Sequence, residues 1–163
     1  IAAGFDTVGG LYEVVRLRDA LREAMALARE VNGYLERKAP WKQFKEDRAA
    51  AGTTVFVAMR AIDSLKLLLA PVLPHSSEQV HALFGYESPL FGDIRSNRYH
   101  ETERSHEVIE YVPTEAERQG IDRWRPSDLA PGTPFQAPAP LYRVLDEAIA
   151  EEEKARLDAQ SEA

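Results

Sequence analysis

The chain has 163 residues, a net charge of −7 and no cysteine, which excludes disulfide bonds, thiolate metal sites and cysteine nucleophiles. Its longest apolar run covers seven residues, 67–73, far short of the roughly 20 that span a membrane. We therefore expect one domain with a tail, and no membrane partner. Because no signal-peptide pattern opens the sequence, we expect a cytoplasmic protein, and Ile1 in place of an initial Met suggests a piece of a longer chain.

The charge is divided unevenly along the sequence. Residues 16–70 hold 11 Lys/Arg against 7 Asp/Glu, whereas residues 86–163 hold 9 Lys/Arg against 17 Asp/Glu. A basic first half and an acidic second half predict two surfaces with different partners.

The first predicted element is a single long amphipathic helix over residues 11–38. Its apolar residues recur at alternating spacings of three and four, which places them on one stripe. The stripe consists of Val14, Leu17, Leu21, Ala24, Ala28, Val31 and Leu35. Pro40 ends the helix, because a proline disfavours helical geometry in the residue before it.

Three further helices are predicted before residue 86. Pro40 fits the first turn of a short helix, residues 53–70 repeat the apolar spacing of three and four, and residues 76–84 form the third helix. Together with the long first helix, these segments predict that residues 1–85 form an antiparallel helical bundle. The expected fold class is therefore all-α.

The rest of the chain lacks this periodicity. Residues 86–140 contain seven prolines and many acidic residues, so we expect an irregular segment with at most short β-like pieces, such as 108–112. Residues 141–163 are expected to form a C-terminal helix and tail. The apolar residues of this helix would pack back onto the bundle or onto a second copy of the chain, so self-association is an open alternative.

Catalytic motifs are missing from the sequence. It has no glycine-rich phosphate-binding loop and no Gly-x-Ser-x-Gly elbow. The four histidines form two pairs spaced by six, which does not place either pair on one helix face; they are His75, His81, His100 and His106. We expect no catalytic residue and no metal site, although composition alone leaves a hydrolase in the acidic half as a remote alternative.

One stretch combines aromatic and basic residues. Trp41 and Phe44 lie close in sequence to Arg37, Lys38, Lys42, Lys45 and Arg48. An aromatic ring offers a stacking face to an unpaired base, while cations beside it hold the phosphates. A nucleic-acid contact at this helix corner is therefore one interpretation, although the residues by themselves favour the other. The alternative interpretation is a core tryptophan below a solvated basic face.

Residues 32–42, Asn-Gly-Tyr-Leu-Glu-Arg-Lys-Ala-Pro-Trp-Lys, resemble the helix end and Ala-Pro-Trp turn of the anticodon-binding domain of methionyl-tRNA synthetases, a class I synthetase family. Residues 24–28 and 68–74 look like the helix pairing with that turn and the end of the next helix. The tail over 132–138 and 140–142 is similar to the same family.

The resemblance implies a helical bundle that recognises the CAU anticodon loop of methionine tRNA, beside a catalytic domain of the same chain. In the family, the tryptophan of the turn stacks on the first anticodon base, a role that Trp41 inherits, with Pro40 shaping the corner. By our charge argument the neighbouring cations contact phosphates. The expected tRNA-binding residues are Trp41, Pro40, Arg37, Lys38, Lys42 and Lys45.

The family's asparagine and arginine anticodon readers, on an earlier helix, have no counterpart here. Its His-Ile-Gly-His and Lys-Met-Ser-Lys-Ser signatures are also absent. The resemblance therefore implies that ATP, with zinc as a further candidate, is bound only by a catalytic part outside this sequence. Two alternatives stay open: the anticodon-binding domain of a leucyl-, isoleucyl-, valyl- or cysteinyl-tRNA synthetase, and a helical protein-interaction module.

Overall fold

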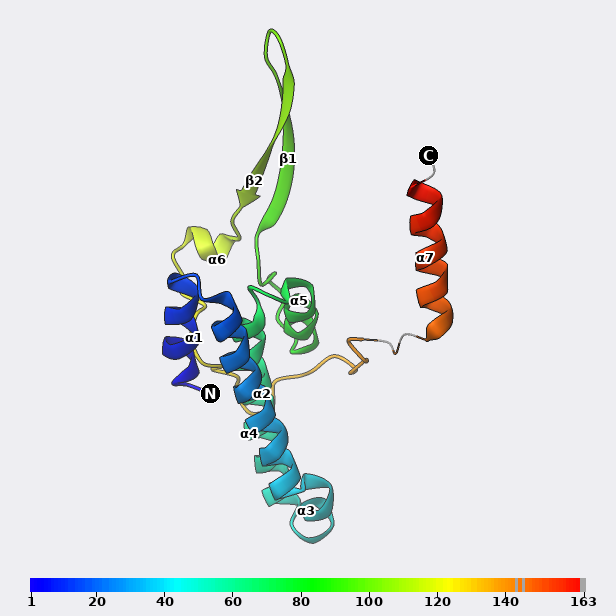
Figure 1. Cartoon of the computed structure of the whole chain (residues 1–163). Helices are drawn as coiled ribbons and strands as arrows, with labels where there is room; N and C mark the ends of the chain where they lie inside the picture. The colour runs from blue at the N-terminus through cyan, green and yellow to red at the C-terminus, as the bar shows by residue number, and fades with distance from the viewer. Residues whose placement is uncertain (143, 145, 162–163) are drawn as a thin grey trace.

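The computed structural model describes residues 1–142, 144 and 146–161 of the chain (Figure 1). Five helices come first: α1 (Gly4–Glu13), α2 (Leu17–Lys38), α3 (Pro40–Glu46), α4 (Arg48–Leu69) and α5 (Pro74–Leu83). Two strands follow, β1 (Asp93–His100) and β2 (Ser105–Val112), and then the short α6 (Glu115–Arg118) and α7 (Glu147–Ser161). The long helices α2 and α4 pack against each other, with α1 towards one end of the pair and α3 at the other (Figure 1).

The prediction of an all-α fold is wrong, because residues 93–112 form an antiparallel hairpin within the segment expected to be irregular. Its register pairs Asp93 with Val112 and His100 with Ser105. β2 is rich in the β-branched and aromatic residues that favour a strand, whereas β1 is mostly polar and has only Ile94 and Tyr99 of these types. Since a polar strand without a buried face shows little alternation, the sequence pattern revealed only the end of the hairpin.

The predicted helix over 11–38 is in fact two helices. The chain turns after α1 at Val15, whose φ of 59° is left-handed, and the Arg16 amide donates to the Leu11 carbonyl at 2.8 Å. Val14 and Leu17, both assigned to the apolar stripe, are exposed at this turn. The stripe runs unbroken across the turn, so its period gave no sign that the helix ends there.

The core lies between α1, α2 and α4 and is closed by a tryptophan from far along the chain. It contains Phe5, Val8, Ala20, Ala24, Val31, Leu65 and Leu68. Trp124 packs edge-on against Phe5 with ring centroids 5.4 Å apart, and its Nε1 donates to the Phe5 carbonyl at 3.0 Å. A Cβ at Gly9 would lie only 2.8 Å from this Nε1, so the close approach of Trp124 requires a glycine there.

A buried polar cluster lies where α4 and α5 meet the chain that leaves α5. Asp63 and Lys66 form a buried ion pair, and the Tyr86 hydroxyl donates to Asp63 at 3.0 Å. The Tyr86 ring stacks on His81 at 4.3 Å, and His81 Nε2 lies 3.0 Å from the Ser88 carbonyl oxygen. Burial, with the Lys66 charge as a further cause, lowers the pKa of His81, so the buried imidazole is neutral.

The expectation that the C-terminal helix packs back onto the bundle is also wrong. α7 begins at Glu147 rather than 141, after Asp146 accepts a hydrogen bond from the Ile149 amide at 3.1 Å. Its described side chains are exposed apart from the half-buried Ile149, and Figure 1 shows α7 apart from the bundle. Charged residues occur on all sides of this helix, which leaves no apolar stripe for docking.

The segment that does return to the bundle precedes α7. Leu141 and Tyr142 border an apolar groove between α4 and α5, and the Tyr142 hydroxyl lies 2.5 Å from Ser76 Oγ. Leu145, which was expected on the same packing face, lies outside the described residues. Within the described part of the chain, no helix combines the length and the apolar character needed to cross a lipid bilayer.

Candidate nucleic-acid interface

A single residue turns the chain sharply from α2 into α3. Ala39 has a left-handed φ of 45°, and its amide donates to the Leu35 carbonyl at 2.8 Å, which closes α2. Pro40 follows at the first turn of α3, where its missing N–H costs nothing, and its ring is buried. The Ala-Pro-Trp sequence therefore places the next residue at the outer end of the bundle.

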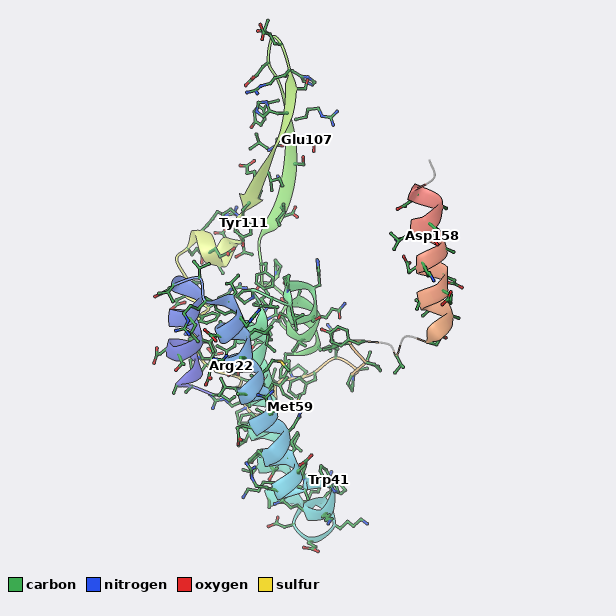
Figure 2. The ribbon with its side chains drawn as sticks, viewed as in Figure 1. Arg22, Trp41, Met59, Glu107, Tyr111 and Asp158 are labelled. Atoms are coloured by element: carbon green, nitrogen blue, oxygen red, sulfur yellow. The ribbon has the colours of Figure 1, made fainter. Side chains whose placement is uncertain are left out.

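Trp41 is a surface residue and not part of the core. It is 59% exposed, and Figure 2 shows it at the end of the bundle remote from Tyr111 and Glu107. Phe44, one turn further along α3, is equally exposed. Exposing two neighbouring aromatic rings to water is unfavourable, and exposed apolar patches of this kind mark interaction sites, so this corner has the character of a contact surface.

The two rings border an open groove of about 530 Å³ along α4. Its lining is almost entirely apolar: Pro40, Trp41, Phe44, Arg48, Ala51, Gly52, Val55, Phe56, Met59 and Phe135. Val55, which belongs to the apolar spacing predicted for residues 53–70, is exposed in the groove. Phe135 arrives from the distant C-terminal segment and packs edge-on against Phe84, a contact that no local pattern could reveal.

Of the basic residues near Trp41 in sequence, Arg48 lines the groove, whereas Arg37, Lys38, Lys42 and Lys45 do not. Lys38, Lys42 and Lys45 are exposed, and within the described residues no ion pair engages their ammonium groups. The Arg37 side chain instead extends back along α2, where its guanidinium lies 3.7 Å from the exposed Glu30 carboxylate. Three exposed lysines therefore lie within four residues of Trp41 along the chain, while Arg37 lies along α2.

Two contacts hold the groove in shape. The buried Thr54 hydroxyl of α4 donates to Gln43 Oε1 of α3 at 2.8 Å, which ties the two helices together. The guanidinium carbon of Arg48 lies 5.2 Å from the centre of the Phe44 ring. Arg48 is recognisable in the sequence as a cation near Trp41, whereas the role of Gln43 and Thr54 has no signal in the sequence.

Exposed aromatic rings beside lysines, at the end of a helical bundle, are features typical of the class of surface that binds unpaired nucleotides. No group of three or more His, Asp or Glu side chains within the described ranges is arranged to hold a metal ion.

Comparison with known proteins narrows this class. The family model for the anticodon binding domain of methionyl tRNA ligase matches residues 2–113. The chain is 60% identical over 161 residues to the methionine–tRNA ligase of Thermomicrobium roseum, covering 99% of the chain and 27% of that ligase. It is 45% identical over 156 residues to the ligase of Roseiflexus sp., covering 95% of the chain and 26% of that ligase. The chain belongs to the family of methionyl tRNA ligase anticodon-binding domains.

The ligase of Chloroflexus aurantiacus is more distant, with 38% identity over 162 residues. This match covers 99% of the chain and 26% of that ligase. The chain therefore spans about a quarter of the length of the curated relatives it matches.

Proposed function

We propose that this chain is the part of a methionine–tRNA ligase that binds the tRNA anticodon loop, with Trp41 stacking on an unpaired anticodon base. The observation that supports the proposal is the 59% exposure of Trp41 at the mouth of an apolar groove. Stacking of a base on one aromatic ring contributes roughly 1–3 kcal/mol. Such a gain compensates for displacing the base from its neighbours in the loop.

The lysines give this surface its affinity for the RNA backbone. Lys38, Lys42 and Lys45 carry charges that no described acidic side chain neutralises, so phosphates would displace only salt ions from them. Arg37 joins them only after leaving Glu30, an exchange that costs little because both groups are exposed. Pro40 has no N–H to donate and acts by fixing the corner that presents Trp41.

Catalysis belongs to other parts of such a ligase. ATP, with zinc as a further candidate, would be bound by the catalytic part, which is also the second partner of this domain. Protein synthesis places the enzyme in the cytoplasm. Within this chain the proposal therefore assigns binding roles only.

Fluorescence-labelled stem-loops test the proposal. A CAU anticodon stem-loop and one with an altered anticodon are titrated with the chain at low and moderate salt. Trp41→Ala should weaken CAU binding by about 1–3 kcal/mol, and Trp41→Phe should recover part of the loss because it keeps a stacking face. Val57→Ala serves as the matched control, since Val57 is exposed on α4 but does not line the groove.

The salt dependence separates this function from a protein-interaction module, because phosphate contacts weaken steeply as salt rises. If Trp41→Ala and Val57→Ala bind the CAU loop as tightly as the unchanged chain, the stacking role of Trp41 is wrong. If neither stem-loop binds at low salt, anticodon binding by this chain is wrong.

A further inference from the structure

The β1–β2 hairpin extends from the bundle at the end opposite α3 (Figure 1). At about 3.3 Å per residue, strands of eight residues reach roughly 25 Å. Almost every described hairpin residue is exposed, so neither face of the ribbon is covered. An isolated two-stranded ribbon is marginally stable in water, which makes an uncovered one an incomplete structure.

The base of this ribbon is nevertheless held firmly. The Glu78 carboxylate of α5 accepts the Leu90 amide with both oxygens at 3.0 Å. Arg123 donates to the carbonyl oxygens of Pro89 and Leu90 at 2.7 and 3.1 Å. These contacts fix the chain immediately before β1, so the direction of the ribbon is set by the bundle.

The other strand is fixed in the same way. The Tyr111 hydroxyl accepts the Gly92 amide at 2.8 Å and donates to the Glu117 carboxylate of α6 at 2.7 Å. The Thr114 hydroxyl caps α6 by accepting a hydrogen bond from the Glu117 amide, and the Thr114 amide donates to the Glu117 carboxylate. A ribbon clamped at both strands is a preorganised arm, and preorganisation lowers the entropic cost of docking.

One face of the arm carries its most exposed aliphatic residues. The register sets Ile94 opposite Tyr111, with Ile109 on the same face because side chains alternate along a strand. Ile94 is 70% exposed, Ile109 is 74% exposed, and Tyr111 on the same face is 49% exposed. We name Ile94, Ile109 and Tyr111 the ribbon patch.

The charge of the ribbon argues against RNA as its partner. Residues 93–112 hold three Arg and five Asp/Glu, so the arm repels phosphates. Its strand edges also disfavour a second copy of the chain. If β1 paired antiparallel with β1 of a second copy along its whole length, Arg95 would lie opposite Arg98. The same pairing of β2 would set Glu107 opposite Glu110. Like charges opposite each other destabilise a sheet.

We propose that the ribbon patch docks onto the part of the ligase polypeptide that lies outside this chain. The proposal rests on the proposed function, in which this domain serves a longer ligase. About three quarters of each relative's length lies beyond the matched part, so a ligase of that length has further polypeptide on which the patch can dock. α3 and the arm lie at opposite ends of the bundle, which lets one end meet the anticodon loop while the other meets the remaining ligase (Figure 1).

Site-specific photo-crosslinking in the full-length ligase tests this docking. A benzophenone amino acid replaces Ile109, or Val108 as the matched control, which is the adjacent β-branched residue on the opposite face and is 41% exposed. Mixed heavy- and light-isotope protein separates crosslinks within one molecule from those between copies. We expect position 109 to crosslink within the molecule to peptides outside these 163 residues, several times more often than position 108.

A second readout uses hydrogen exchange of the ribbon amides in the full-length protein. Ile109→Lys should speed their exchange about tenfold, the equivalent of about 1.4 kcal/mol, while Val108→Lys changes it little. Crosslinks from position 109 to tRNA, to a second copy or to nothing would overturn the docking proposal. Because Ile109 is remote from α3, anticodon stem-loop binding should be the same in all these variants, so failure of the anticodon function would show separately.

Discussion

The two tryptophans of the chain occupy contrasting positions. Trp124 closes the core over α1, donates a hydrogen bond from Nε1 and lies edge-on to Phe5 and Tyr12. Trp41 stands in solvent on α3, bordering a groove. The same residue type thus stabilises the fold at one end of the bundle and is left open for a partner at the other. Stability and recognition can therefore be separated by mutation.

The largest expected effect is on the closed end. Trp124→Ala should lower the free energy of unfolding by about 3 kcal/mol, because it leaves a cavity over Phe5 and removes a hydrogen bond. Trp41→Ala should change it by less than about 0.5 kcal/mol, as surface substitutions usually do. Urea unfolding followed by circular dichroism measures both; equal losses of stability would end the distinction between the two tryptophans.

The glycines of α1 test how tightly Trp124 is seated. Gly9→Ala should destabilise the chain by about 1–3 kcal/mol, because the new Cβ lies 2.8 Å from Trp124 Nε1 and forces the ring to move. Gly10→Ala is the matched control, since nothing lies within 4 Å of its Cβ position and alanine favours the helix by up to about 1 kcal/mol. Thermal unfolding should show the two variants shifting in opposite directions.

Acid should lower the free energy of unfolding through the buried His81 of α5. Burial and the Lys66 charge lower the pKa of His81, so below about pH 6.5 the unfolded chain binds a proton that the folded chain resists. Stability then falls with decreasing pH until the folded His81 also titrates, by at most about 1.4 kcal/mol per pH unit. His81→Gln should flatten the dependence in urea titrations between pH 7 and 5, and an unchanged slope would contradict this assignment.

The smallest effect concerns the turn between α1 and α2. Val15 is exposed and holds a left-handed φ of 59°, which is strained for a β-branched residue. Val15→Gly should raise the free energy of unfolding by about 1 kcal/mol, since relief of strain exceeds the added freedom of the unfolded chain. Val14→Gly, at a neighbouring exposed residue with negative φ, should instead destabilise.

The Trp41 corner was predictable from sequence because it is local. Ala39, Pro40 and Trp41 are consecutive, and a proline both ends the preceding helix and fits the first turn of the next one. The resemblance to the methionyl-tRNA synthetase family rested on the same residues and is confirmed by the family match over residues 2–113. The role of each basic residue in tRNA binding stays a prediction.

The features that sequence missed depend on contacts between distant residues. Trp124 meets Phe5 across 119 positions, and Phe135 reaches the groove through Phe84, so neither leaves a periodic trace. The hairpin was missed because β1 is polar, and the break at Val15 because the apolar stripe continues through it. The boundaries drawn at 85 and 140 stay predictions.

The one-residue joint at Ala39 has a consequence for how a complex forms. With α2 and α3 both regular helices and Gln43 bonded to Thr54, little backbone freedom remains to be lost on this side when a ligand arrives. In the proposed complex, the ordering cost then falls on the RNA loop. Loops whose bases are already splayed outward should therefore associate faster, and the protein selects among RNA conformations rather than adjusting its own.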